Sequence, residues 1–116
     1  MKKVFRGLLI LFLLTACSKK FQTITTNEAL KLMEEGVTVI DVRTEDEFNL
    51  SHIKNAINIP LDEIMNIDYD KDTKLIIYCA SGVRSQNAIN QLIDLGYTSL
   101  YNLDGGLLNW GGEIEE

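Results

Sequence analysis

Cys79 and Arg84 are the residues of this 116-residue sequence whose types and spacing best fit covalent chemistry. They enclose the short run Ala80–Val83 and follow the apolar run Leu75–Tyr78. A cysteine attacks as the thiolate, which backbone N–H groups, a helix N-terminus and a nearby cation all stabilise. Gly82 permits the positive φ of a tight loop, and Arg84 offers a planar fork of donors that can brace the loop or meet an anion. We therefore predict that Cys79 and Arg84 are catalytic.

The residues after Cys79 form the predicted binding loop. N–H groups of the loop, and of a helix that begins near Ser85, are expected to point inward and form an anion-binding concavity. The helix dipole adds about half a positive charge at the same place. The predicted substrate-binding residues are Ala80, Ser81, Gly82, Val83, Arg84 and Ser85.

Strand and helix signals alternate along the chain and place this loop after a buried strand. Apolar and β-branched runs predict strands at 37–40, 56–59, 74–78 and 99–102, and residues 21–24 are compatible with a short first strand. Capping boxes and helical spacing predict helices from 25, from 44 to 50, from 61 to 67, from 85 to 95 and after Gly105. We predict an α/β fold with a mostly parallel central sheet covered by helices on both faces. Ligands of such sheets bind beyond the carboxyl ends of the strands, where Cys79 lies.

The first twenty residues have the pattern of an export signal. Three basic residues among the first six precede the apolar run 7–16, which is short for a bilayer span. Leu14–Cys17 resembles the lipobox of bacterial lipoproteins, which implies cleavage before Cys17 and a lipid on its thiol. An uncleaved membrane anchor and a stray buried helix are the alternatives.

We therefore divide the chain into a signal peptide (1–16), a lipidated N-terminus with a short tether (17–24) and one domain (25–116). The expected location is outside the cytoplasm, on a bacterial membrane, on the periplasmic or outer cell-surface side. With Cys17 lipidated, Cys79 has no partner for an internal disulfide. A Cys17–Cys79 disulfide and an inert buried thiol are alternatives that the sequence around Cys79 disfavours.

The charge of the chain argues against nucleic acid as a partner. Eleven Lys and Arg stand against seventeen Asp and Glu, and removal of the signal leaves eight against seventeen, a net charge of −9. Nucleic-acid binding depends on neutralising phosphates with basic residues. The acidic residues 113–116 are interpreted as a solvated end.

The segment Cys79–Ser85, of the form C-x-x-G-x-R-S, resembles the active-site loop of rhodanese-type sulfurtransferases. Further motifs of that family follow in the same order as in its members: Ile40–Arg43, Glu47–Phe48, His52–Ile53, Ala56–Pro60, Gly96–Tyr97, Asp104–Gly106 and Trp110. Together they cover residues 25–111. Ser51 departs from the pattern, because the family usually has glycine before the histidine.

The resemblance implies a single-domain sulfurtransferase that works through a persulfide. Cys79 takes a sulfane sulfur from a small-molecule donor, thiosulfate or another persulfide source, and a thiol or cyanide acceptor removes it. No metal or organic cofactor is implied, and we expect a monomer. Asp41, Arg43 and His52 would be structural residues near the loop, with Arg43 also a candidate electrostatic contributor and His52 no general base. An exposed Cys79 thiolate is expected to be open to oxidation.

Two other functions stay open at this point. Phosphatases and arsenate reductases of the same fold use a cysteine–arginine loop, but with five intervening residues rather than the four between Cys79 and Arg84. The wider loop suits a tetrahedral oxyanion. A non-catalytic binding module is the second alternative, although inactive relatives usually lose the cysteine that is present here.

Overall fold

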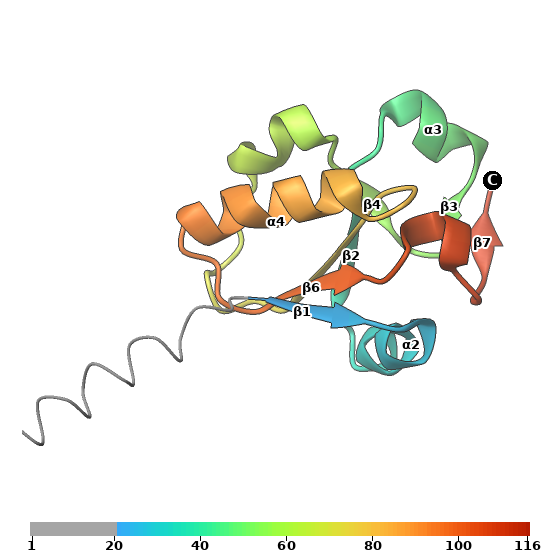
Figure 1. Ribbon diagram of the computed structural model, residues 1–116, viewed down its shortest axis with the longest axis horizontal. Coiled ribbons are helices and arrows are strands. Elements are labelled where there is room, and N and C mark those ends of the chain that lie inside the picture. Colours follow the sequence, from blue (N-terminus) through green and yellow to red (C-terminus); the bar gives the residue numbers. More distant parts are fainter. Residues whose placement is uncertain (1–20) are drawn as a thin grey trace, which may run out of the picture.

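Five parallel strands form the central sheet, in the order β1-β6-β5-β2-β4 (Figure 1). The computed structural model describes residues 21–116, so Cys17, the predicted signal and most of the tether lie outside the described residues. The strands are β1 (Phe21–Ile24), β2 (Thr38–Asp41), β3 (His52–Ile53), β4 (Ile57–Asn58), β5 (Leu75–Tyr78), β6 (Leu100–Leu103) and β7 (Ile114–Glu115). The helices are α2 (Thr26–Glu34), α3 (Glu45–Leu50) and α4 (Val83–Asp94), with 3-10 helices η1 (Leu61–Asn66) and η2 (Gly106–Asn109).

Helices cover both faces of the sheet, which confirms the predicted fold class. Figure 1 shows α4 and η1 on one side of the strands and α2 on the other. Strand β5 is at the centre and is buried throughout. Its alternate side chains enter two separate cores: Leu75 and Ile77 pack with α4, and Ile76 and Tyr78 pack with the side chains of α2. Because β5 is packed by a core on each of its faces, the position of the next residue, Cys79, is fixed from both sides of the sheet.

Both capping boxes predicted from the sequence are confirmed. Thr25 accepts from the Glu28 amide while Glu28 accepts from the Thr25 amide, and Thr44 and Glu47 are paired in the same way. These reciprocal bonds satisfy N–H groups that the first helical turn leaves without partners. They fix where α2 and α3 begin, with one residue between β1 and α2 and three residues between β2 and α3.

Three boundaries differ from the sequence-based expectation. Residues 21–24 form the short first strand that the sequence allowed, β1, which pairs with β6 over its whole length, so they belong to the sheet and not to the tether. Helix α4 begins at Val83, two residues before Ser85, because Gly82 takes a left-handed conformation and opens the helix. The acidic end is not simply solvated: Ile114–Glu115 pairs with His52–Ile53 as β7, although both residues of β7 remain exposed.

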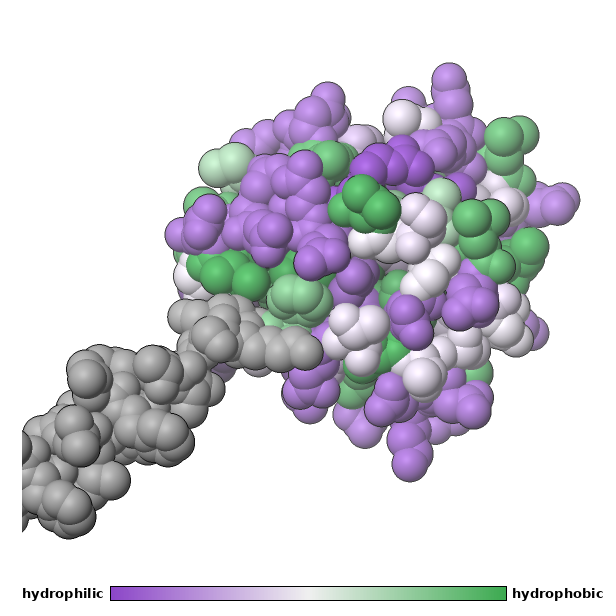
Figure 2. Space-filling model, viewed as in Figure 1, coloured by the Kyte–Doolittle hydropathy of each residue, from purple (hydrophilic) through white to green (hydrophobic). Residues whose placement is uncertain are grey.

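The surface is mostly polar on the face seen in Figure 2, with apolar side chains scattered between hydrophilic ones. Leu50, Val83 and Leu108 are the most exposed large apolar residues of the described chain. Within residues 21–116, no helix combines the length and the apolar character that a membrane crossing requires.

Candidate active site

Cys79 lies at the carboxyl end of the central strand β5, and its side chain is fully buried. Its sulfur accepts hydrogen bonds from the amide of Gly82 (3.0 Å) and from the amide of Ser85 (3.4 Å). Burial corrects the expectation of an exposed thiolate, because the loop folds over the sulfur. An oxidant must therefore enter the loop before it reaches Cys79.

The sulfur takes the position that a capping side chain occupies in other helices. The N-cap of α4 is Gly82, with φ +107°, and it provides no side-chain cap. Ser85 is the third helical residue, and its N–H group is one of those that a first turn leaves without an intrahelical partner. Because that N–H points at Sγ, negative charge on Cys79 sits at the positive end of the α4 dipole.

These contacts set the acidity of the thiol. Burial raises the pKa of Cys79, whereas hydrogen bonding with the Ser85 side chain and with the amides of Ser85, Gly82 and Ser81 lowers it. The lowering effects prevail, so the pKa lies below the ordinary thiol value. A depressed pKa favours the thiolate, which is the nucleophilic form of cysteine.

The 3-10 helix η2 supports the loop from behind. The amides of Leu107 and Leu108 donate to the carbonyls of Cys79 (2.8 Å) and Ala80 (3.0 Å). Gly106 makes this close approach possible, since a Cβ atom there would lie 2.5 Å from the Cys79 carbonyl oxygen. These bonds hold two carbonyl groups of the loop toward η2. The amide of Gly82, in the same loop, faces the sulfur.

Arg84 does not turn toward the centre of the loop. Its Nη1 and Nη2 atoms donate to the two carboxylate oxygens of Glu47, at 2.8 and 3.0 Å. This bidentate pair raises the pKa of Arg84 and lowers that of Glu47 to about 2. Of the two roles expected for Arg84, the structure supports bracing, because the pair ties α4 to α3.

Asp41 and Arg43 form a buried ion pair at the carboxyl end of β2. Arg43 Nη2 lies 2.7 Å from the Asp41 carboxylate and also donates to the Ser51 carbonyl, at 2.7 Å. Burial lowers the pKa of Arg43, but the hydrogen bond and charge of Asp41 raise it more. The pair therefore fixes the turn at Ser51, where the sequence departs from the family's glycine.

His52 has partners away from Cys79. Its Nδ1 atom lies 2.8 Å from the Phe48 carbonyl oxygen, its ring stacks on the ring of Phe48, and Nε2 lies 3.3 Å from Glu115. These contacts join α3, β3 and β7. The position suits a structural role and not a proton transfer at the sulfur.

The remaining loop residues line the rim. Val83 and Ser81 are exposed and Ala80 is half-buried. Beside Arg84, a groove of about 360 Å³ runs between η1 and α4, with Leu61, Asp62 and Met65 among its lining residues. A larger cavity, of about 560 Å³, lies around residues 96–101, near the amino end of the sheet and away from Cys79. Within residues 21–116, no three His, Cys, Asp or Glu side chains converge as metal ligands would.

Two residues of the site were not predicted as site residues. Gly106 was noted only as part of a motif, although a Gly–Gly pair is a signal of close backbone approach. Asn102, on β6, accepts a hydrogen bond of 2.7 Å from the Ser85 hydroxyl. No local pattern marks Asn102, because its partner lies seventeen residues away.

Comparisons with known proteins agree with this geometry. The profile of the rhodanese-like domain matches residues 25–113. The thiosulfate sulfurtransferase GlpE of Shewanella oneidensis is 31% identical over 93 residues, covering 78% of this chain and 92% of GlpE. The crystal structure of a rhodanese-like domain protein from Staphylococcus aureus superimposes with a TM-score of 0.71 at 36% identity, covering 81% of this chain and 96% of that chain. A Rhodopseudomonas palustris protein described as a possible tyrosine phosphatase superimposes with a TM-score of 0.72 at 28% identity, covering 82% and 85%.

Proposed function

This chain belongs to the family of rhodanese-like domains, and from that premise we propose that it is a sulfurtransferase that carries a sulfane sulfur on Cys79. One observation carries the proposal: the Cys79 sulfur lies at the N-terminus of α4 and accepts hydrogen bonds from the amides of Gly82 and Ser85. A sulfur in this position is suited to hold negative charge, first as the thiolate and then as the persulfide.

The exchange takes two steps. In the first, the Cys79 thiolate attacks the sulfane sulfur of the donor, a new S–S bond forms, and the donor's former partner leaves with the electron pair of the broken bond. With thiosulfate, the leaving group is sulfite. In the second, a thiolate or cyanide attacks the outer sulfur, and Cys79 leaves as the thiolate. Each step exchanges one bond to sulfur for another, so no external oxidant or reductant is needed.

Phosphatase chemistry is the second candidate, because the Rhodopseudomonas relative carries that description. Two observations disfavour it for this chain. The loop has four residues between Cys79 and Arg84, and the Arg84 guanidinium is already paired with Glu47. An oxyanion in the loop would therefore lack the charged fork that could hold it.

Mass spectrometry of the treated protein tests the proposal. After reaction with thiosulfate or a polysulfide, Cys79 should gain one sulfur, about 32 Da, and cyanide should remove it as thiocyanate. Cys79→Ser should lose both steps, because its hydroxyl is not ionised at neutral pH. Cys17→Ala is the control for the second cysteine and should react normally. Thiocyanate production by Cys79→Ser at the wild-type rate would reject the mechanism.

We also propose that Cys17 is the lipidated N-terminus of the exported protein, on the evidence of the sequence Leu14–Cys17. Labelling with a palmitate analogue in a bacterial host should mark the wild-type protein and not Cys17→Ala. A wild-type protein that remains unlabelled and begins at Met1 would contradict this.

A further inference from the structure

Two hydrogen bonds join three buried polar side chains inside an apolar core, those of Cys79, Ser85 and Asn102. These three residues are called the polar chain below. Ser85 and Cys79 are fully buried and Asn102 is 7% exposed. Asn102 extends from the same face of β6 as Leu100, toward α4, where the neighbouring cluster is largely apolar. A carboxamide in such a cluster needs a polar partner, and its partner is Ser85.

The hydrogen bonds of the polar chain run in one direction, because a serine hydroxyl carries one hydrogen and can donate to only one partner. Ser85 Oγ donates to Asn102 Oδ1 at 2.7 Å, and the Cys79 thiol, at 3.5 Å, donates to Ser85 Oγ. In this arrangement the Ser85 oxygen is an acceptor toward sulfur and so supports the protonated thiol. The same hydroxyl can stabilise a thiolate only when its hydrogen turns from Asn102 to the sulfur.

We propose that Asn102 is a positioning residue for Cys79: its carboxamide, by holding or releasing the Ser85 hydrogen, sets whether Ser85 accepts from the thiol or donates to the thiolate. When Cys79 ionises, its proton leaves to solvent and the Ser85 hydrogen turns to Sγ. The Asn102 amide can then rotate and donate from Nδ2 to Ser85 Oγ. An amide has both a donor and an acceptor end, so it fits either direction of the chain.

Charged groups near the sulfur come from several elements. Arg84 and Glu47 are paired across α4 and α3, and Asp41 and Arg43 are paired at the end of β2. Asp104 follows β6 directly. Substitutions at positions 102 and 85 leave all of these charged residues in place. Differences in the alkylation midpoint among the variants below therefore reflect the hydrogen bonds of the polar chain and the one negative charge that Asn102→Asp introduces.

The test measures Cys79 ionisation through the pH dependence of its alkylation by iodoacetamide in the purified protein. Asn102→Asp can only accept from Ser85, so it should raise the alkylation midpoint by about one pH unit or more. Asn102→Leu has a similar shape and no acceptor, which frees the Ser85 hydrogen for sulfur, so its midpoint should fall. Midpoints that move in the same direction in both variants would overturn the proposal.

Ser85→Ala separates the hydrogen-bond effect from simple charge repulsion. In the Ser85→Ala background, Asn102→Leu should leave the midpoint unchanged, and Asn102→Asp should raise it less than it does beside Ser85. Equal effects of Asn102→Asp in the two backgrounds would show that Asn102 does not act through Ser85. Asn90→Asp, the same change on the exposed side of α4, is the matched control. If circular dichroism shows that Asn102→Asp does not fold, the comparison of Asn102→Leu in the two backgrounds, with Ser85 and with Ser85→Ala, tests the proposal by itself.

This inference deepens the proposed function and rests on it only in assigning sulfur chemistry to Cys79. Alkylation requires a thiolate but no sulfur donor. A protein whose Cys79 never accepts sulfur would therefore refute the proposed function and leave the role of Asn102 measurable. The reverse outcome, sulfur transfer with alkylation midpoints that do not respond to position 102, would refute only this inference.

Discussion

Glu47 has two partners that lie in different parts of the chain. Its carboxylate accepts from the amide and hydroxyl of Thr44, which closes the capping box of α3, and from both Nη atoms of Arg84. The residue that completes the capping box of α3 therefore also holds the last residue of the C-x-x-G-x-R motif. Loss of this carboxylate should affect both the helix and the loop that holds Cys79.

Replacement of Arg84 tests the bracing role. Arg84→Ala should reduce sulfur transfer by roughly tenfold, the equivalent of about 1.4 kcal/mol in a barrier, with little change in fold. Arg84→Lys should recover only part, because one ammonium cannot replace a two-donor fork. Steady-state thiocyanate formation measures both variants. Full activity in each would mean that the loop amides suffice without Arg84.

The pair also predicts a pH dependence of stability. The pKa of Glu47 is lowered from 4.5 to about 2 in the folded chain, so its stabilising effect is complete above pH 4.5 and is lost as the pH falls toward 2. The pair is about a third exposed, so the effect should be at most about 1 kcal/mol.

Urea unfolding of wild type and Glu47→Gln from pH 7 to pH 2 measures this effect. The difference in unfolding free energy should shrink through the acid range. Glu45→Gln, in the same helical turn, is the control and should show no comparable change. A wild-type advantage that stays constant down to pH 2 would contradict the assignment.

At the scale of elements, η2 is the structure on which the Cys79 loop depends. Its amides bind two loop carbonyls, and Gly106 lets the two backbones meet. The loop conformation is thus fixed partly by a segment that follows the next strand of the sheet.

Gly106→Ala should damage the loop more than an ordinary glycine replacement. Gly106 has φ +62°, and its new Cβ would overlap the Cys79 and Ala80 carbonyls. Gly36→Ala is a matched control, since Gly36 has φ +91° but no atom within 4 Å of its Cβ position. Each variant should lose about 1 to 2 kcal/mol of stability from its backbone conformation. Only Gly106→Ala should lose more than this and also lose sulfur transfer, as measured by urea unfolding and thiocyanate assay.

The distance in sequence between interacting residues explains which features the sequence predicts. The capping boxes, the buried strand before Cys79 and the positive φ at Gly82 depend on near neighbours, and all three are present. The Arg84–Glu47 pair joins residues 37 positions apart, and the Ser85–Asn102 bond joins residues 17 apart. Such partners are decided by how the elements pack, which local patterns do not encode. The start of α4 differs from the expectation because its N-cap, Gly82, offers no capping side chain, and the Cys79 sulfur accepts from the first turn instead.

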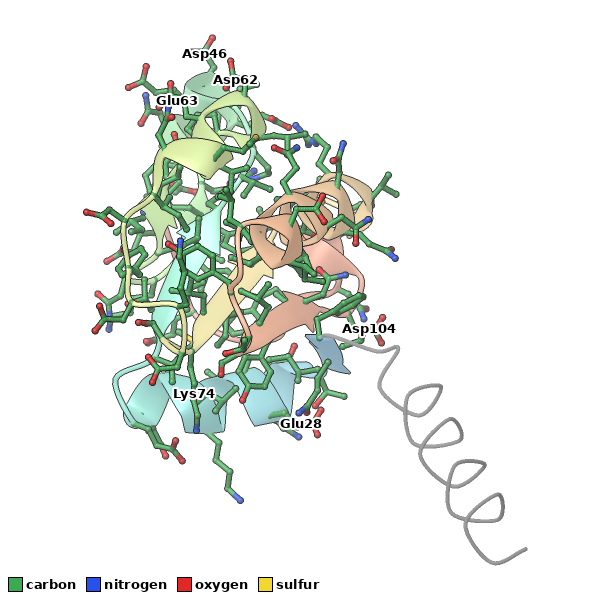
Figure 3. The ribbon with its side chains drawn as sticks, turned by 90° about the vertical axis from the view of Figure 1, so that its left-hand side faces the viewer. Glu28, Asp46, Asp62, Glu63, Lys74 and Asp104 are labelled. Atoms are coloured by element: carbon green, nitrogen blue, oxygen red, sulfur yellow. The ribbon has the colours of Figure 1, made fainter. Side chains whose placement is uncertain are left out.

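At the scale of the whole molecule, acidic residues strongly outnumber basic ones. Residues 21–116 contain all seventeen acidic residues and only six Lys and Arg. Acidic residues follow the carboxyl ends of three strands, with Asp46 after β2, Asp62 and Glu63 after β4, and Asp104 after β6. In Figure 3, Asp46, Asp62 and Glu63 extend from one side of the molecule, while Glu28 and Lys74 lie toward the opposite side. The two arginines near Cys79 are already paired with carboxylates.

An acidic surround should slow the approach of thiosulfate, which is a dianion. The rate of Cys79 persulfide formation from thiosulfate should rise several-fold as ionic strength increases from about 0.01 to 0.15 M, because the screening length falls from about 30 to 8 Å. Stopped-flow or quenched mass spectrometry gives this rate.

Charge variants locate the source of that effect. Asp62→Asn with Glu63→Gln should flatten the dependence on salt, whereas Glu34→Gln with Glu35→Gln, at the end of α2, should flatten it less. A rate that falls as salt is added would indicate attraction and contradict the prediction.

The start of β1 at Phe21 also limits how the domain can sit on a membrane. Four peptide steps separate Cys17 from Phe21, a reach of at most about 14 Å. Because β1 runs parallel to β5 through β6, the amino ends of these strands share one end of the sheet and Cys79 lies at the other. If Cys17 carries the proposed lipid, the bilayer would adjoin the amino end, and the loop of Cys79 would open toward the aqueous phase. Donors and acceptors would then be water-borne molecules, not lipids of the same membrane.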